Sequence, residues 1–268
     1  MPATRSPLDP DRVRALLADG GWAAPLPLLL ATVGSTNAEV AARAGEPEGT
    51  CVVGEEQTAG RGRHDRAWLS PVHAGLWMSV LIRPGDVDTA RWGWLPLSAG
   101  LAARDAVRAL QPLPLELKWP NDLVVQQAAC GGSGGLAKTG GILAEVVGPD
   151  AVVIGIGINV SLRAEELPTQ AATSLLLEGG STDREALLAG ILLRLRERLV
   201  QWRADDPALI RDYRSACVTI GRLVDAVLPG EERLRGTAVG IDDAGHLLVE
   251  SDSQVRTVAA GDVIHATI

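Results

Sequence analysis

Apolar residues follow both strand-like and helical spacing along the chain, which predicts a mixed fold of strands and helices. Continuous apolar runs predict strands over residues 50–55, 76–82, 115–119, 141–147 and 151–158. Helical spacing and capping residues predict helices over 9–18, with Leu16 and Leu17 inward, and over 38–44, 92–110 and 183–202. Thr182 or Asp183 is the expected N-cap of the last helix.

The pattern changes after residue 213. Short β-like stretches at 223–228, 234–241, 247–250 and 255–258 alternate with turns, which predicts a small β-barrel of about 50 residues. We therefore expect an α+β domain over residues 1–215 and a barrel over 216–268, with the boundary near Ala216. Residues 126–135 (QQAACGGSGG) are rich in glycine and predict a flexible surface loop.

Composition narrows the class of protein. The 268 residues are 46% hydrophobic, which is enough for a buried core and excludes a disordered chain. A net charge of −8 disfavours a chain-wide nucleic-acid binder. Three widely spaced cysteines (51, 130 and 217) indicate neither a disulfide framework nor a zinc site. With no membrane span or signal peptide expected, a soluble cytoplasmic protein is predicted.

The strongest local signal is the segment GRGRHDRAW at residues 60–68. Its glycines let backbone N–H groups approach an anion, and its arginines suit phosphate or carboxylate. Trp68 offers a stacking surface for a planar base. The alternatives are a nucleic-acid-binding RG tail or a solvated turn, but the segment occurs once, between predicted strands, which favours a pocket.

Two lysine-containing segments carry further candidate chemistry. In KWPND (118–122), Lys118 can meet phosphate and Asp122 can hold Mg²⁺, or the two can simply be a surface charge and part of a turn. Lys138 precedes a glycine pair that opens a strand, where it can face developing negative charge or lie in a flexible loop.

Two polar segments lie next to predicted elements. Residues 155–159 (GIGIN) do not complete a dinucleotide-binding fingerprint, so Asn159 either binds a ligand or forms a turn. Residues 34–37 (GSTN) suit helix capping. No nucleophile–base triad or histidine metal spacing is visible, which leaves charge stabilisation and positioning of a phosphorylated ligand.

Taken together and in order, these segments resemble the biotin–protein ligase family from about residue 32 to the end. The matching stretches are GSTN (34–37), EEQTAGRGR (55–63), Arg66, Trp68, KWPND (118–122), K-x-x-GIL (138–143), GIGIN (155–159) and TSL (173–175). The resemblance implies a class II synthetase-like catalytic domain with a mixed sheet, followed by an SH3-like barrel. It also implies that biotin and MgATP form biotinyl-5′-AMP and pyrophosphate, after which a lysine of a biotin carboxyl carrier domain takes the biotin.

The resemblance also implies roles for individual residues. The biotin site would comprise Ser35, Thr36, Asn37, Gln57, Gly60, Arg61, Gly62, Arg63, Lys138 and Gly141. The ATP and adenylate site would comprise Arg63, Arg66, Trp68, Lys118, Asn121 and Asn159. Lys138, Arg63 and Lys118 would act as catalytic charges, and Asp122 would lie on the Mg²⁺ side.

Two departures and two rival functions remain at this stage. Asp65 stands where the family loop usually has glycine, and we expect it to tolerate left-handed backbone. The 126–135 segment looks like an insertion before Lys138. We expect a ligase without DNA binding, because too few residues precede the first motif for a DNA-binding domain, and a monomer or weak homodimer. The rivals are a lipoate–protein ligase of the same fold and a nucleic-acid-binding module.

Overall fold

A seven-stranded mixed sheet forms the centre of the computed structural model, which describes residues 5–69, 71–127, 135–228, 233–259 and 262–265. Its strand order is β1-β2-β3-β7-β6-β5-β4, and only the β1–β2 pair is parallel. The strands are β1 (Leu28–Leu30), β2 (Cys51–Gly54), β3 (Gly75–Ile82), β4 (Leu115–Lys118), β5 (Asp122–Gln126), β6 (Leu136–Val146) and β7 (Val152–Asn159). The predicted α+β class is confirmed.

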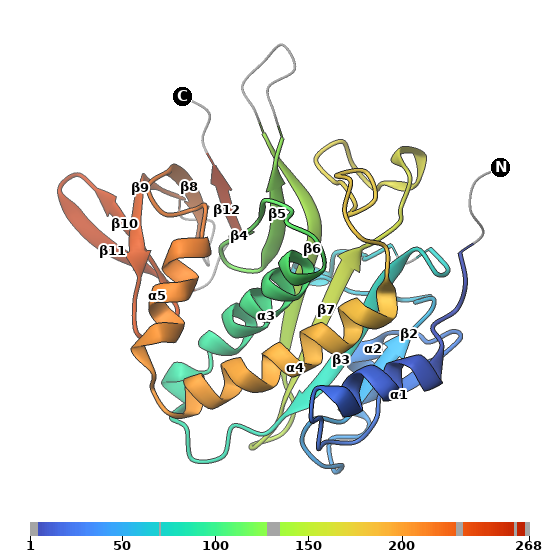
Figure 1. Cartoon of the computed structure of the whole chain (residues 1–268). Coiled ribbons are helices and arrows are strands. Elements are labelled where there is room, and N and C mark those ends of the chain that lie inside the picture. Colours follow the sequence, from blue (N-terminus) through green and yellow to red (C-terminus); the bar gives the residue numbers. More distant parts are fainter. Residues whose placement is uncertain (1–4, 70, 128–134, 229–232, 260–261, 266–268) are drawn as a thin grey trace.

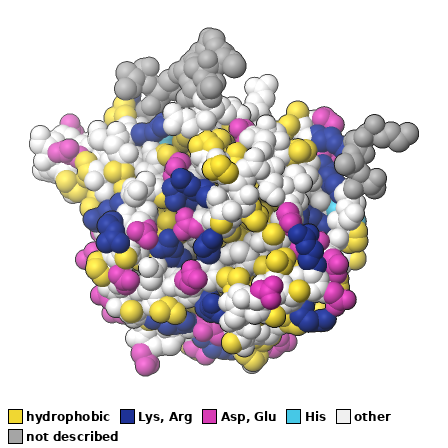
Figure 2. Space-filling model, in the orientation of Figure 1, with side chains coloured by type: hydrophobic (Ala, Val, Ile, Leu, Met, Phe, Trp, Pro, Cys, Tyr) yellow, Lys and Arg dark blue, Asp and Glu magenta, His cyan; other side chains and the backbone are white. Residues whose placement is uncertain are grey.

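Two long helices cover one face of this sheet (Figure 1). The helices are α1 (Pro10–Asp19), α2 (Thr36–Ala41), α3 (Trp94–Leu110), α4 (Arg184–Arg203) and α5 (Pro207–Ala216). The predicted cap of α4 is confirmed, because the Asp183 carboxylate accepts a bond from Ala186 N at 3.0 Å. Figure 2 shows this helical face with acidic and basic side chains interspersed, as on a solvated surface. None of the described helices is both long and apolar enough to cross a membrane.

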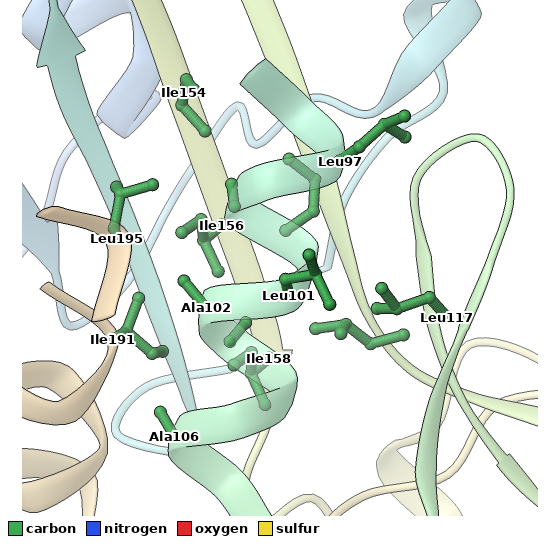
Figure 3. Close-up of a cluster of buried hydrophobic side chains, with 14 of the residues drawn as sticks. Leu97, Leu101, Ala102, Ala106, Leu117, Ile154, Ile156, Ile158, Ile191 and Leu195 are labelled. Atoms are coloured by element: carbon green, nitrogen blue, oxygen red, sulfur yellow. The ribbon is translucent and has the colours of Figure 1, made fainter. Parts of the chain in front are cut away.

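The alternation of side chains along β7 separates the core from the site. Ile154, Ile156 and Ile158 point toward α3 and pack in the main core (Figure 3), where each buried side chain contributes about 1.5–3 kcal/mol. The alternate residues Gly155, Gly157 and Asn159 therefore face the other side of the sheet. That side carries α2 and the loops that follow β2.

The C-terminal part is a five-stranded sheet of order β11-β10-β9-β8-β12. Its strands are β8 (Leu223–Val227), β9 (Arg233–Ile241), β10 (Leu247–Ser251), β11 (Gln254–Val258) and β12 (Asp262–His265). Two tryptophans of the larger part donate hydrogen bonds to the C-terminal part. Trp94 Nε1 donates to Asp243 O and Trp119 Nε1 donates to Gly245 O, both at 3.0 Å. Helix α5 ends at Ala216, the residue at which we predicted the domain boundary.

Several predicted elements need correction. The sequence analysis missed β1, β5, β12 and α5, and β6 begins five residues before the predicted strand. The short lengths of β1 and β12 gave no usable periodicity, whereas α5 has an overlooked start signal: Asp206 caps it and Pro207 is its first residue. The helix predicted over 38–44 runs instead from Thr36 to Ala41.

Side-chain burial adds detail to two smaller predictions. In α1, Leu17 is buried in the core and the partly buried Leu16 packs against it, as predicted, and Val13 is buried as well. Cys51 and Cys217 are buried free thiols, and burial raises the pKa of each. Cys130 and most of the predicted 126–135 loop lie outside the described residues.

Candidate active site

One cavity of about 1300 Å³ brings together nearly all of the sequence-predicted site residues. It lies on the glycine-bearing side of β7 and is walled by α2, the 57–69 loop, the β4–β5 turn, β6 and the C-terminal sheet. The predicted residues that line it are Ser35, Thr36, Asn37, Gln57, Arg61, Gly62, Arg63, Arg66, Trp68, Lys118, Asn121, Asp122, Lys138, Gly141 and Asn159. Gly60 is buried beneath the loop instead, where its carbonyl accepts from Trp68 N at 2.9 Å.

Hydroxyl and amide groups form one end of the cavity. Gln57 Oε1 accepts from Thr36 N at 2.8 Å and from Thr36 Oγ1 at 3.1 Å. Ser79 Oγ lies 2.7 Å from Thr36 Oγ1 and donates to Asn37 Oδ1 at 2.6 Å. Ser35 occupies the N-cap position of α2 but makes no capping bond with its side chain. Gln57, twenty-one residues after Thr36, therefore provides the acceptor for a backbone N–H at the start of α2. We had assigned this capping role to the local GSTN segment.

The glycines of GIGIN are required by close packing. A Cβ on Gly155 would lie 2.1 Å from Asn37 Oδ1, and one on Gly157 would lie 2.9 Å from the Trp68 indole. Gly141 is the direct neighbour of Gly157 across the β6–β7 ladder, and its own Cβ would meet Trp68 at 3.3 Å. Gly141 and Gly157 thus form a bare strip of sheet, which we call the glycine floor.

Trp68 lies on the glycine floor. Its ring packs edge-on against Trp77, with centroids 6.2 Å apart, and Lys138 Nζ lies 5.4 Å from its centroid. Trp68 Nε1 is buried and has no hydrogen-bond partner among the described residues. A buried donor without a partner is uncommon in a folded protein, so this indole is suited to meeting an acceptor on a ligand.

The loop that carries Trp68 turns back on itself. Arg61 pairs with Ala67 in an antiparallel bridge, and Gly62 N donates to Arg66 O at 2.7 Å. The left-handed backbone that we expected at Asp65 occurs at His64, with φ of 55°. The Asp65 side chain lies outside what the structure describes.

Lysines and a single aspartate form the opposite end of the cavity. Lys138 Nζ lies 2.5 Å from Asp122 Oδ1, and Lys118 Nζ lies 3.8 Å from Asp122 Oδ2. Arg63 reaches this end through Asn121 Oδ1 at 3.4 Å. Asn121 is itself fixed, because its Nδ2 donates to Ile142 O at 2.9 Å.

The lysine and asparagine of β6 and β7 also hold the loop that follows β7. Lys138 N donates to Ala171 O at 2.7 Å, and Thr173 N donates to Lys138 O at 2.8 Å. Asn159 Nδ2 donates to Thr173 O at 2.9 Å. Despite the preceding insertion-like segment, Lys138 is thus fastened by its backbone on two sides.

Sequence reasoning missed several residues around the cavity. Ser79 and Glu145 bond to Asn37, and Arg222 and His265 enter the wall from the C-terminal sheet. Alternation along β6 places 141, 143 and 145 on one face and was a usable signal for Glu145. Burial, followed by the charges of Lys118 and Arg222, lowers the pKa of His265 from 6.5 to about 4.

Among the described residues, no group of three or more His, Cys, Asp or Glu side chains could hold a metal ion. Mg²⁺ commonly binds through one or two carboxylates together with substrate phosphates and water. Asp122 is a single carboxylate at the cationic end of the cavity, and it fits binding of Mg²⁺ together with substrate phosphates and water. The residues present therefore suit a metal that arrives with a nucleotide.

Comparison with known proteins places the chain in a family. Residues 33–159 match the biotin/lipoate A/B protein ligase family, and residues 219–266 match the biotin protein ligase C-terminal domain. The chain is 40% identical to a biotin–[acetyl-CoA-carboxylase] ligase of Mycobacterium tuberculosis over 97% of both proteins. The chain belongs to the biotin protein ligase family. The resemblance seen in the motifs, and the ligase class that it implied, are confirmed.

Further relatives agree with this placement. The bifunctional ligase/repressor BirA of Escherichia coli is 34% identical over 91% of this chain and 74% of its own length. A structure of biotin protein ligase from Aquifex aeolicus in complex with biotin and ATP aligns with a TM-score of 0.77. That alignment covers 90% of this chain and 99% of the Aquifex chain at 28% identity.

Proposed function

We propose that this protein activates biotin with ATP and transfers it to a lysine of a biotin carboxyl carrier domain. In the first step a biotin carboxylate oxygen bonds to the α-phosphorus of ATP while pyrophosphate leaves. In the second step the lysine amine bonds to the acyl carbon of biotinyl-5′-AMP, a proton is lost from the amine, and AMP leaves. Biotin and ATP are the ligands of the Aquifex relative, and the carrier domain is the acceptor implied by the relatives' names.

The observation that carries this proposal is the polarity of the cavity along the β6–β7 ladder. Leu143 pairs with Gly155 at the hydroxyl and amide end, and Gly141 pairs with Gly157 one step further on. Two residues of strand span roughly 7 Å. The cavity therefore offers, in sequence, a neutral hydrogen-bonding end, a flat apolar floor and a cationic end, which match the ureido head, the tail and the carboxylate of biotin.

The two ends of the cavity have different roles in this reaction. Ser35, Thr36 and Gln57 bind the head group of biotin, with Asn37 beside them. Trp68 moves off the glycine floor when the ligand enters and stacks beside the adenine. Lys138, Lys118, Arg63 and Arg66 offset the repulsion between a carboxylate and the phosphates, which is the principal barrier to bringing two anions together.

The remaining elements of the proposal concern ions and partners. Asp122 is the carboxylate that would hold the Mg²⁺ of MgATP, and the bound ion would offset charge on the phosphates. The Gly60–Arg63 segment closes over the adenylate and keeps water away from the anhydride. We also propose that the enzyme acts in the cytoplasm, as a monomer or weak homodimer, without binding DNA.

Exchange of labelled pyrophosphate into ATP tests the first step. We expect exchange that depends on biotin and is not supported by lipoate. Lys138→Ala should reduce it by about 100- to 1000-fold, because a charge aimed at the reacting groups is lost. Biotin binding by calorimetry should survive in that variant.

A matched variant makes a negative result informative. Exchange with lipoate in place of biotin would overturn the substrate assignment and favour the lipoate rival. If no acid supports exchange, Asp65→Gly restores the family loop and shows whether this one residue has disabled the chain. An Asp65→Gly protein that is also inactive would overturn the ligase proposal.

A further inference from the structure

Glu145 is a side chain of β6 that the reaction outlined above does not use. Its Oε2 accepts from Asn37 Nδ2 at 2.5 Å, and its Oε1 lies 3.2 Å from Arg61 Nη2. Its side chain is 34% exposed and is not part of the cavity lining, whereas both of its partners, Asn37 and Arg61, line the cavity. One carboxylate thus joins Asn37 of α2 to Arg61 of the loop that carries Trp68.

The bond to Asn37 fixes the orientation of an amide. Asn37 Nδ2 donates to Glu145 and weakly to Leu143 O at 3.4 Å, while Asn37 Oδ1 accepts from Ser79. Gly155 provides the room for that oxygen. Because both amide atoms are engaged within the protein, Asn37 supports Thr36 and Gln57 through Ser79 rather than offering an unfilled donor to a ligand.

The ion pair with Arg61 fixes the loop and its charge. Arg61 is the first arginine of the GRGR segment, and its bridge to Ala67 places it on the strand-like arm that ends at Trp68. The Glu145 carboxylate offsets the Arg61 charge, so this end of the cavity carries no net charge from the pair. The opposite end concentrates Lys118 and Lys138 around one aspartate.

We infer that Glu145 is a positioning and specificity residue, which holds the Gly60–Trp68 loop against Asn37 and keeps the head-group end of the cavity neutral. This inference rests on the proposed function for the identity of the ligand. An uncharged ureido ring suits a site in which the Arg61 charge is already paired with Glu145, whereas Arg61 without that carboxylate would attract an anion to the wrong end. Glu145 acts through Arg61 and Asn37, and it is not a catalytic residue.

Glu145→Gln is the sharpest test, because the glutamine oxygen can still accept from Asn37 Nδ2, while the negative charge that Arg61 pairs with is lost. We expect the KM for biotin in pyrophosphate exchange to rise by about 5- to 10-fold, with kcat at saturating biotin within about 2-fold of wild type. Glu145→Ala also removes the acceptor of Asn37 Nδ2 and should raise this KM further. Glu116→Gln is the control and should change neither value, because Glu116 is another partly buried glutamate whose arginine partner, Arg104, does not line the cavity.

A second measurement needs no activity. In the ligand-free protein, trypsin should cut after Arg61, Arg63 or Arg66 at least about 3-fold faster in Glu145→Gln than in wild type and Glu116→Gln, as mapped by mass spectrometry. Equal cleavage rates with an unchanged biotin KM would overturn the inference. Wild-type and Asp65→Gly proteins that both show no exchange with biotin would overturn the proposed function instead, and the cleavage rates would still decide whether Glu145 holds the loop.

Discussion

The two ends of the cavity differ in charge and in how their polar groups are bonded within the protein. At the neutral end both side-chain amide atoms of Asn37 are engaged, Nδ2 with Glu145 and Leu143 O and Oδ1 with Ser79. At the cationic end one aspartate meets two lysines, and the closer contact, from Lys138, is a direct ion pair. The first end is therefore organised before a ligand arrives, while the second must exchange its internal ion pairs for contacts with phosphate and metal.

This difference assigns distinct consequences to damage at each end. A change at the preorganised end should lower the affinity for biotin, because the bound geometry must then be rebuilt on binding. A change at the cationic end should alter turnover, because its charges are best used when the two anions meet. The following predictions test that division, and each uses a residue whose contacts are explicit.

Gly155→Ala should break the preorganised end and give the largest effect on the KM for biotin. The new Cβ would meet Asn37 Oδ1 at 2.1 Å, so the amide must leave its position. Overpacking of this kind costs about 1–3 kcal/mol, equivalent to roughly 5- to 160-fold if it falls entirely on the KM for biotin. Gly45→Ala is the matched control, because nothing lies within 4 Å of its added Cβ. An unchanged biotin KM in a folded Gly155→Ala protein would contradict the packing argument.

Asp122→Asn should damage the cationic end while sparing the other. The neutral amide no longer holds Lys138 at its 2.5 Å position and offers a poorer ligand to Mg²⁺. We expect kcat for pyrophosphate exchange to fall by about 10-fold, with biotin affinity by calorimetry unchanged. Asp150→Asn, at a surface pair with Arg83 far from the cavity, serves as the control. A selective loss of biotin affinity in Asp122→Asn would reverse our assignment of the two ends.

Local patterns predicted the elements that carry the cavity more reliably than the contacts within it. The apolar run of β7 and the cap of α4 were predictable, because each depends on neighbouring residues. The roles of Gly155 and Gln57 were not. Gly155 is required by Asn37, more than 100 positions away, and Gln57 caps a helix that begins 21 residues earlier.

The family motifs supplied what local patterns could not. They selected Lys138 across an insertion-like segment, and the structure places it in the cavity beside Asp122. They also named Gly60, which lies under the loop rather than on the lining. The walls contributed by the C-terminal sheet carry no recognisable motif, because Arg222 and His265 reach the cavity only through the docking of one part on the other.

His265 gives the smallest predicted effect and links the cationic end to stability. Its Nε2 lies 3.2 Å from Thr219 Oγ1, which accepts from Trp119 N in the KWPND segment. Burial and the nearby charges of Lys118 and Arg222 lower its pKa from 6.5 to about 4, so the folded protein resists protonation that the unfolded chain accepts. The free energy of unfolding should therefore fall as pH drops from 6.5 toward 4, by at most about 1 kcal/mol after solvent screening.

Denaturant unfolding of wild type and His265→Gln between pH 7 and 4.5 isolates this contribution. Glu166, whose pKa Arg5 lowers to about 2, keeps its stabilising effect until pH falls below 4.5 and therefore does not interfere. All other titratable groups are common to both proteins, so the difference between the two curves belongs to position 265. The free energy of unfolding of wild type minus that of the variant should be constant above pH 6.5. Below pH 6.5 this difference should decrease, because only wild type carries the histidine. Parallel curves across the whole range would show that the folded protein does not resist protonation of His265.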